Sequence, residues 1–189
     1  MIGDSNMNFS VNSKEAINHE LSKLSDFSRI YYLERLSKEK GDIVVKKYCY
    51  NKLAQMYLSK GMHSKSADNM ESIARLALSH EEKIKVMMDE VKILIDGADY
   101  ARAEAVFDKV VSLAPLVKKI DLRKQLIFIY KARAQALEKA MKNGAAMLAY
   151  ERIFKIGDEI DRRETREKLL FLYLKLGKTA DYNRLKGLV

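Results

Sequence analysis

The stretch YNKLAQMYLSKG, at residues 50–61, decides the fold of this chain. Leu53, Ala54 and Tyr57 follow one another at steps of one and three residues, which places them on one side of an α-helix. Gly61 comes four residues after the tyrosine. Glycine often ends a helix because it adopts the left-handed backbone conformation without strain. The stretch therefore predicts a helix that packs through one side and stops abruptly.

Parts of the same pattern return along the chain. Residues 169–177, LLFLYLKLG, repeat the helix and its closing glycine. Small and apolar residues follow Gly61, Gly97 and Gly144 at helical spacing, and they predict a second helix that packs closely against the first: Ala67 and Ala74; Tyr100, Ala103, Phe107 and Val110 before Pro115; Ala149, Ile153 and Ile156. The glycine marks are separated by 36 residues (61 to 97), 47 residues (97 to 144) and 33 residues (144 to 177). The sequence therefore predicts a helix–turn–helix unit that is repeated several times along the chain.

This pattern resembles the tetratricopeptide repeat (TPR) family, whose units are pairs of antiparallel helices of about 34 residues. The resemblance covers residues 44–189 and implies an all-α fold, in which antiparallel helix hairpins stack into a right-handed α-solenoid. Two of the three glycine intervals fit that length. The middle interval is too long, so we expect the helix between Pro115 and Gly144 to be extended or preceded by a short extra helix.

The packing side of the first helix in the second unit depends on its register. If Gly97 sets that register, Asp89 and Glu90 fall at packing positions. A shift by one residue places apolar side chains there instead: Met87, Val91 and Leu94. We expect the shifted register, because burying two carboxylates without partners costs several kcal/mol.

The sequence predicts a disordered tail at residues 1–12 and a single repeat domain at residues 13–189. Within that domain we expect N-terminal helices over 13–41 and four hairpin units, over 42–78, 80–115, 116–160 and 161–189. Ser13 and Asp42 are the expected caps of two early helices. One proline and eight glycines among 189 residues are few for a protein of strands and tight turns. Nine or ten helices are expected.

Several protein classes are disfavoured by composition. No apolar run approaches the roughly 20 residues that span a bilayer, and residues 1–13 lack the basic and apolar segments of a secretion signal. The lone Cys49 permits no internal disulfide. We expect a cytoplasmic protein.

The net charge of +9 lies in the C-terminal part, where residues 116–189 carry 18 basic and 9 acidic side chains. The TPR resemblance implies that the first helix of each unit lines a concave groove that receives peptides. Lysines and amides on that side suit an acidic peptide or a C-terminal carboxylate. The alternative is a solvated face on a basic protein. The candidate partner-binding residues are Asn51, Lys52, Gln55, Lys85, Lys92, Lys124, Lys131, Gln135, Lys142, Lys168 and Lys175.

The expected function is that of a noncatalytic interaction module that binds a peptide segment or a partner protein. One alternative is a nucleic-acid-binding protein that uses the basic C-terminal half, with Tyr130 and Tyr150 available for base stacking. Another is a structural homo-oligomer joined through Leu185, Leu188 and Val189 at the end of the last helix.

Signals for catalysis, metals or cofactors are weak, and we expect none of the three. The three histidines are not paired at a spacing of three or four residues, so they do not predict a helix-borne metal site. Cys49 lies between two tyrosines and is expected to be a buried structural thiol. An acidic group around Asp158 and Asp161 is expected to cap the next helix rather than to hold a cation.

Overall fold

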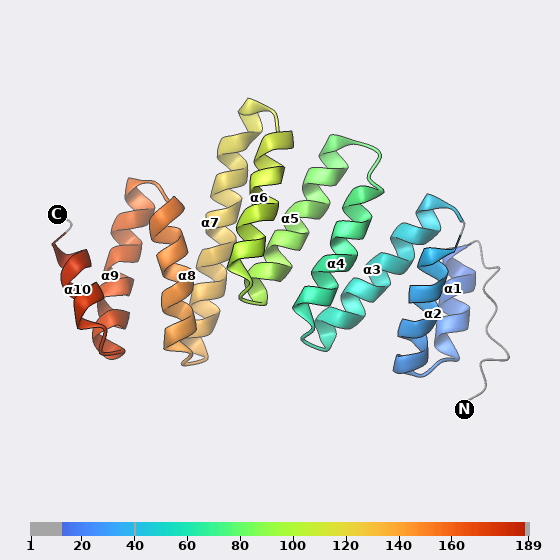
Figure 1. The fold of residues 1–189 in the computed structure, drawn as a ribbon, viewed down its shortest axis with the longest axis horizontal. Helices are drawn as coiled ribbons and strands as arrows, with labels where there is room; N and C mark the ends of the chain where they lie inside the picture. Colours follow the sequence, from blue (N-terminus) through green and yellow to red (C-terminus); the bar gives the residue numbers. More distant parts are fainter. Residues whose placement is uncertain (1–12, 40, 188–189) are drawn as a thin grey trace. The chain divides into compact units, whose positions relative to one another are not determined.

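The computed structural model describes residues 13–39 and 41–187, and within these ranges all regular structure is helical (Figure 1). The fold is therefore all-α, as the sequence predicts. The predicted tail at residues 1–12 lies outside the described residues. The helices are α1 (Lys14–Ser22), α2 (Asp26–Lys38), α3 (Ile43–Ser59), α4 (His63–Arg75), α5 (His80–Asp96), α6 (Tyr100–Leu113), α7 (Leu116–Lys139), α8 (Asn143–Ile156), α9 (Glu159–Lys175) and α10 (Thr179–Lys186).

Contacts divide the chain into two compact units, Met1–Ala114 and Pro115–Val189. Unit 1 contains α1 to α6 and unit 2 contains α7 to α10. The division falls at Pro115, which cannot donate a backbone hydrogen bond to the preceding helix. A single repeat domain over residues 13–189 stays a prediction, since each unit is compact by itself.

In unit 1, α2 packs on α3, α3 on α4, α4 on α5 and α5 on α6. Leu53, Ala54 and Tyr57 are buried, which confirms the packing side predicted for this helix. Cys49 is also buried in the core formed by α1, α2 and α3. Burial raises the pKa of its thiol to about 11, so the group stays protonated and unreactive at neutral pH. This agrees with a structural thiol.

In unit 2, α7 packs on α8, α8 on α9 and α9 on α10. The expected extended helix is α7, which has 24 residues. The last hairpin begins earlier than expected: α9 starts at Glu159 and its N-cap is Asp158, whose side chain accepts a hydrogen bond from the backbone N–H of Asp161. Ala149 is fully buried, as are Ala67 and Ala103 of unit 1, which confirms that these small residues allow close packing of helices.

The four helix ends that close α3, α5, α7 and α9 share one geometry. Gly61 and Gly177 have positive φ, as predicted, but in the other two turns the left-handed residue is Ala98 or Met141. In each turn the next residue's N–H donates to a carbonyl five residues back; the donor and acceptor pairs are Met62 and Tyr57, Asp99 and Leu94, Lys142 and Leu137, and Lys178 and Tyr173.

The left-handed residue lies one position after Gly97, which agrees with the shifted register expected for this helix, and three positions before Gly144, where the glycine-based register was wrong. The reason is that these closing hydrogen bonds offset the cost of about 1–2 kcal/mol for a non-glycine residue in the left-handed conformation. Measured between the left-handed residues, the repeat lengths are 37 (61 to 98), 43 (98 to 141) and 36 (141 to 177).

The register expected for α5 is confirmed in part. Met87, Val91 and Leu94 are buried, and Asp89 is exposed. Glu90 is also buried, although its carboxylate was expected to avoid the core. The prediction was wrong for Glu90 because it took no account of a cation from another helix.

Candidate functional site

The predicted partner-binding residues of unit 1 lie on two helices. Lys52 and Gln55 of α3 line a cavity of about 350 Å³ whose other walls come from α1 and α2. Asn51 is exposed beside them, and its side-chain oxygen accepts a hydrogen bond of 3.3 Å from Gln55. Lys85 and Lys92 are exposed on α5, and no hydrogen bond or ion pair in the described ranges joins them to the α3 residues. The structure thus brings Lys52 and Gln55 to one cavity and leaves the α5 lysines separate.

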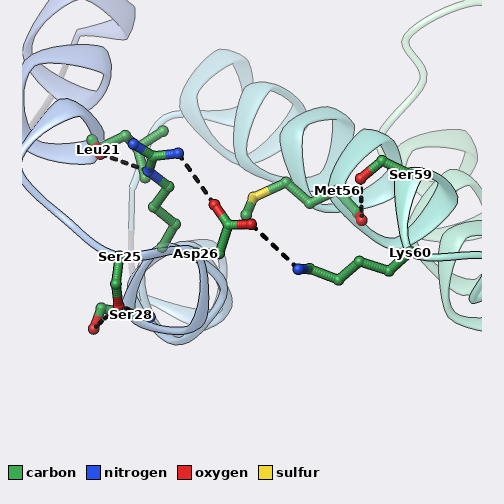
Figure 2. A network of polar contacts seen from close by, with 8 residues as sticks. Leu21, Ser25, Asp26, Ser28, Met56, Ser59 and Lys60 are labelled. Carbon is green, nitrogen blue, oxygen red and sulfur yellow. Dashed lines mark hydrogen bonds and ion pairs between the residues drawn. The ribbon is translucent and has the colours of Figure 1, made fainter.

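The floor of this α3 cavity is a network that connects α1, α2 and α3, and Figure 2 shows it. The Asp26 carboxylate lies 3.3 Å from the Arg29 guanidinium and 3.3 Å from the Lys60 ammonium group. Arg29 also donates a 2.7 Å hydrogen bond from Nε to the carbonyl of Leu21 at the end of α1. Asp26 pairs with both of these cations and neutralises one of the two charges, so the network holds three helices together and keeps a net charge of +1.

Lys52 differs from those two cations. It lies 5.5 Å from the centroid of the Tyr48 ring, and Lys14 lies 5.8 Å from the same ring. Neither lysine forms an ion pair with a carboxylate within residues 13–39 and 41–187. The Tyr48 hydroxyl donates to the side-chain oxygen of Asn18 on α1. Two lysines with uncompensated charge thus flank one aromatic ring at this side of unit 1.

In unit 2, Lys131 of α7 is engaged by α9. Its Nζ lies 2.7 Å from the Asp161 carboxylate and 3.0 Å from that of Glu164, and these hydrogen bonds raise the pKa of the lysine. Lys168 of α9 lies 3.6 Å from Glu138 of α7. Two of the predicted cations therefore bridge α7 and α9, and a ligand would have to compete with carboxylates of the protein itself.

Large apolar side chains are exposed next to these ion pairs, a feature that the sequence analysis missed. At roughly 100° per residue, Ile120, Lys124, Phe128, Lys131 and Gln135 lie within about 80° of one another on α7. We call the combined surface the α7–α9 face. Its residues are Val117, Ile120, Lys124, Phe128, Lys131 and Gln135 of α7, and Ile160, Glu164, Lys168, Phe171, Leu174 and Lys175 of α9.

Every apolar residue of the α7–α9 face is more than half exposed, including Phe128 at 72% and Phe171 at 60%. Lys124 carries no ion pair among the described residues, and Lys175 lies 5.8 Å from the centroid of the Phe171 ring. The exposed position of Phe128 could have been predicted from the sequence, because helical spacing places Phe128 on the same side of α7 as Lys124 and Lys131. The remaining predicted cation, Lys142, is exposed in the turn between α7 and α8.

The proposed oligomer contact at the end of the chain is partly corrected. Leu185 is 5% exposed, because it packs inside unit 2, so its side chain is not free to form a contact with another molecule. Leu188 and Val189 lie outside the described residues.

In residues 13–39 and 41–187, no three His, Cys, Asp or Glu side chains are placed together so that they would hold a metal ion. In the same part of the chain, no helix combines the length and apolar character needed to cross a bilayer.

Comparisons with known proteins do not assign a family. No family model matches the chain, and no curated protein matches it. Among solved structures, BtubC (BKLC) from P. vanneervenii is similar with 15% sequence identity and a TM-score of 0.40, over 89% of this chain and 73% of that one. Similarity at this level carries no argument about function.

Proposed function

We propose that this chain is a noncatalytic helical-repeat scaffold, a TPR-like right-handed α-solenoid, that binds a partner protein through an acidic segment carrying apolar side chains. The α7–α9 face is the proposed binding surface. The observation that carries the proposal is the exposure of Phe128, Phe171 and their apolar neighbours among lysines. Several large apolar groups exposed on one side of a helix support an interaction surface better than isolated ones do.

The apolar side chains and the lysines of the α7–α9 face would contribute different amounts of binding free energy. Burying a Phe, Leu or Ile side chain stabilises a complex by about 1.5–3 kcal/mol, whereas an exposed ion pair contributes about 0–1 kcal/mol. The apolar residues would therefore supply most of the affinity. Lys124 and Lys175 would select an acidic partner and speed its association, because charge complementarity acts mainly on specificity and on-rate.

The intramolecular ion pairs refine this proposal. Lys131 and Lys168 already contact Asp161, Glu164 and Glu138, so they add little positive charge for a partner. Lys124 and Lys175 form no ion pair among the described residues, and each lies next to an exposed aromatic ring: Lys124 is one helical turn before Phe128, and Lys175 lies over the Phe171 ring. An acidic segment would then place its apolar side chains on these rings and its carboxylates beside the two lysines.

Selection from a phage-displayed peptide library on the full chain tests the proposal without a known partner. We expect enrichment of peptides that interleave Asp or Glu with large apolar residues. Their affinity should fall at least tenfold for the Lys124→Glu/Lys175→Glu variant. The matched control is Lys38→Glu/Lys155→Glu, which makes the same charge change at two exposed lysines outside the face. Equal affinity for both double variants would remove the α7–α9 face from the proposal.

The other expectations stay predictions. Sedimentation velocity distinguishes a partner-binding face from a self-association face, since the proposal expects a monomer at micromolar concentration. A dimer that dissociates in the Phe128→Ser variant would assign the face to a second copy of the chain instead. Binding of nucleic acid and a cytoplasmic location are supported by nothing beyond the basic charge and the sequence features already described.

A further inference from the structure

A second cavity lies on a different side of α9, and it does not belong to the α7–α9 face. Its volume is about 360 Å³, and its lining comes from the end of α8 and the first half of α9: Phe154, Glu159, Ile160, Arg162, Arg163 and Arg166. At roughly 100° per residue, Arg162 and Arg166 point away from the side that carries Glu164 and Phe171. Only Ile160 is shared with the α7–α9 face.

The last described helix, α10, lies beside only part of α9. α10 has 8 residues, whereas α9 has 17 and α8 has 14. At about 1.5 Å per residue, α10 covers roughly 12 Å of a helix that is roughly 25 Å long. Its described end reaches Arg166, whose guanidinium donates to the carbonyls of Leu185, at 3.2 and 3.3 Å, and Lys186, at 3.0 Å. The part of α9 before Arg166 therefore lacks a covering helix from α10.

The cavity carries an uncompensated positive charge. Arg166 is held in place by two carbonyl groups, which bear no full negative charge. Arg162 and Arg163 form no ion pair with a carboxylate anywhere in the described part of the chain. The lining contains one carboxylate, Glu159. Three guanidinium groups and one carboxylate leave a net charge of +2.

The N-terminus of α9 does not supply the anion site. Its backbone N–H groups are capped by Asp158, which accepts a 2.9 Å hydrogen bond from Asp161. A second anion at that end would be repelled by the Asp158 carboxylate. The attraction for a ligand therefore comes from the arginine side chains.

We propose that this cavity binds a phosphomonoester on an apolar or aromatic carrier. A phosphomonoester carries a charge of about −1.5 to −2 at pH 7, which complements the net +2 of the lining. Guanidinium groups match phosphate oxygens with paired hydrogen bonds. The half-buried Phe154 and the exposed Ile160 form an apolar wall for the carrier. The volume falls within the range of about 300–1,000 Å³ that is typical of small-ligand pockets.

Phenyl phosphate and phenyl sulfate provide the first test, because they share a ring and differ in charge. Isothermal titration of the full chain at pH 7.5 should give at least tenfold tighter binding for phenyl phosphate. The preference should weaken below about pH 6, where the phosphate takes up its second proton. Equal binding of the two compounds, or no binding of phenyl phosphate at millimolar concentration, overturns the proposal.

Two double variants test whether phenyl phosphate binds in this cavity. Arg162→Gln/Arg163→Gln should lower the affinity for phenyl phosphate at least tenfold, and these exposed side chains can be changed without disturbing the core. Lys124→Gln/Lys175→Gln removes the same charge from the α7–α9 face and should leave phenyl phosphate binding unchanged. If the lysine variant loses phosphate binding and the arginine variant keeps it, the cavity is not the site. Because the two surfaces use different residues, either proposal can fail while the other holds.

A third arm identifies the source of the phosphate. A phosphotyrosine heptapeptide and phenyl phosphate carry the same phosphorylated aromatic ring, attached to a peptide in one case and free in the other. Binding of the peptide at least tenfold tighter than that of phenyl phosphate assigns the cavity to a phosphorylated protein segment, and equal binding assigns it to a small phosphomonoester. Binding of phenyl phosphate with exclusion of the peptide supports the small molecule as well.

Discussion

The two units place an interhelix cluster of charges in different surroundings. In unit 1, Arg102 of α6 lies 2.7 Å from Asp68, 3.8 Å from Glu71 and 3.6 Å from Glu90, whose side chain is 3% exposed. In unit 2, Lys131 contacts two carboxylates, of which Glu164 is 61% exposed and Asp161 is 15% exposed.

The difference is access to water. Burial raises the pKa of Glu90 to about 7, although the neighbouring Arg102 opposes that rise. The buried Glu90 carboxylate therefore destabilises unit 1, and its attraction to Arg102 offsets part of that cost. Removing one partner of such a buried pair lowers the stability strongly. Around Lys131, water reaches Glu164 freely and Asp161 only in part, so the cluster is less buried than the Glu90 carboxylate and its outer ion pair stabilises the fold weakly. The buried Glu90 carboxylate makes the stability of unit 1 depend on its ion pair with Arg102. The less buried ion pairs of Lys131 leave charged side chains of unit 2 accessible to a ligand.

Replacing Arg102 should give the largest effect. We expect Arg102→Met to lower the free energy of unfolding of unit 1 by about 3–5 kcal/mol at pH 8, because the buried Glu90 carboxylate loses its nearest cation. At pH 5 the loss should be smaller, since Glu90 is then protonated in the folded unit. Native-state hydrogen exchange of the α5 and α6 amides measures both values. A loss of the same size at the two pH values would contradict the role assigned to Glu90.

Glu90→Gln should change the pH dependence of stability. The folded pKa, about 7, is higher than the ordinary value of 4.5. The contribution of Glu90 is therefore fully present below about pH 4.5 and is lost as the pH rises through 7. Across that window the wild type should lose up to about 3 kcal/mol relative to the glutamine variant. Urea unfolding at pH 4.5, 6 and 8 checks the difference, and a constant offset between the two proteins would show that Glu90 does not titrate in this range.

The exposed aromatic residues should affect binding and leave stability almost unchanged. Phe128→Ser and Phe171→Ser should each weaken a peptide selected on the wild type by roughly tenfold, in line with the burial of an aromatic side chain. Their melting temperatures should stay near that of the wild type, because both rings are mostly exposed. Full retention of peptide binding in both variants would separate the α7–α9 face from the binding function.

Lys131→Met should give the smallest effect, and it is the matched partner of the Arg102 variant. We expect it to cost about 1 kcal/mol, because the Glu164 partner is accessible to water and Asp161 keeps partial access to it. The same hydrogen-exchange measurement, made on the amides of α7 and α9, gives this value. A loss as large as that of Arg102→Met would mean that exposure does not distinguish the two clusters.

Much of the helical architecture was accessible from the sequence because local signals carry it. Asp42 caps α3, Pro115 precedes α7, and the apolar spacing of residues 53–57 gives the buried side of α3. The left-handed turns at Ala98 and Met141 were missed, since residue type alone does not reveal where closing hydrogen bonds form.

Features that depend on a neighbouring helix were not accessible in the same way. The burial of Glu90 requires knowing that Arg102 of another helix lies beside it. The pairing of Lys131 with Asp161 and Glu164 likewise joins residues about 30 positions apart. Helical periodicity reports which residues share a side of one helix, and it does not report which charges another helix brings to that side.

The central claim is that a partner docks on the α7–α9 face. Hydrogen exchange of the full chain, with and without a saturating peptide selected on it, tests this most directly. We predict protection in α7 from Lys124 to Gln135 and in α9 from Lys168 to Lys175, with the α4 to α6 amides unchanged. Protection confined to α4 to α6, or none in α7 and α9 at saturation, would contradict the claim.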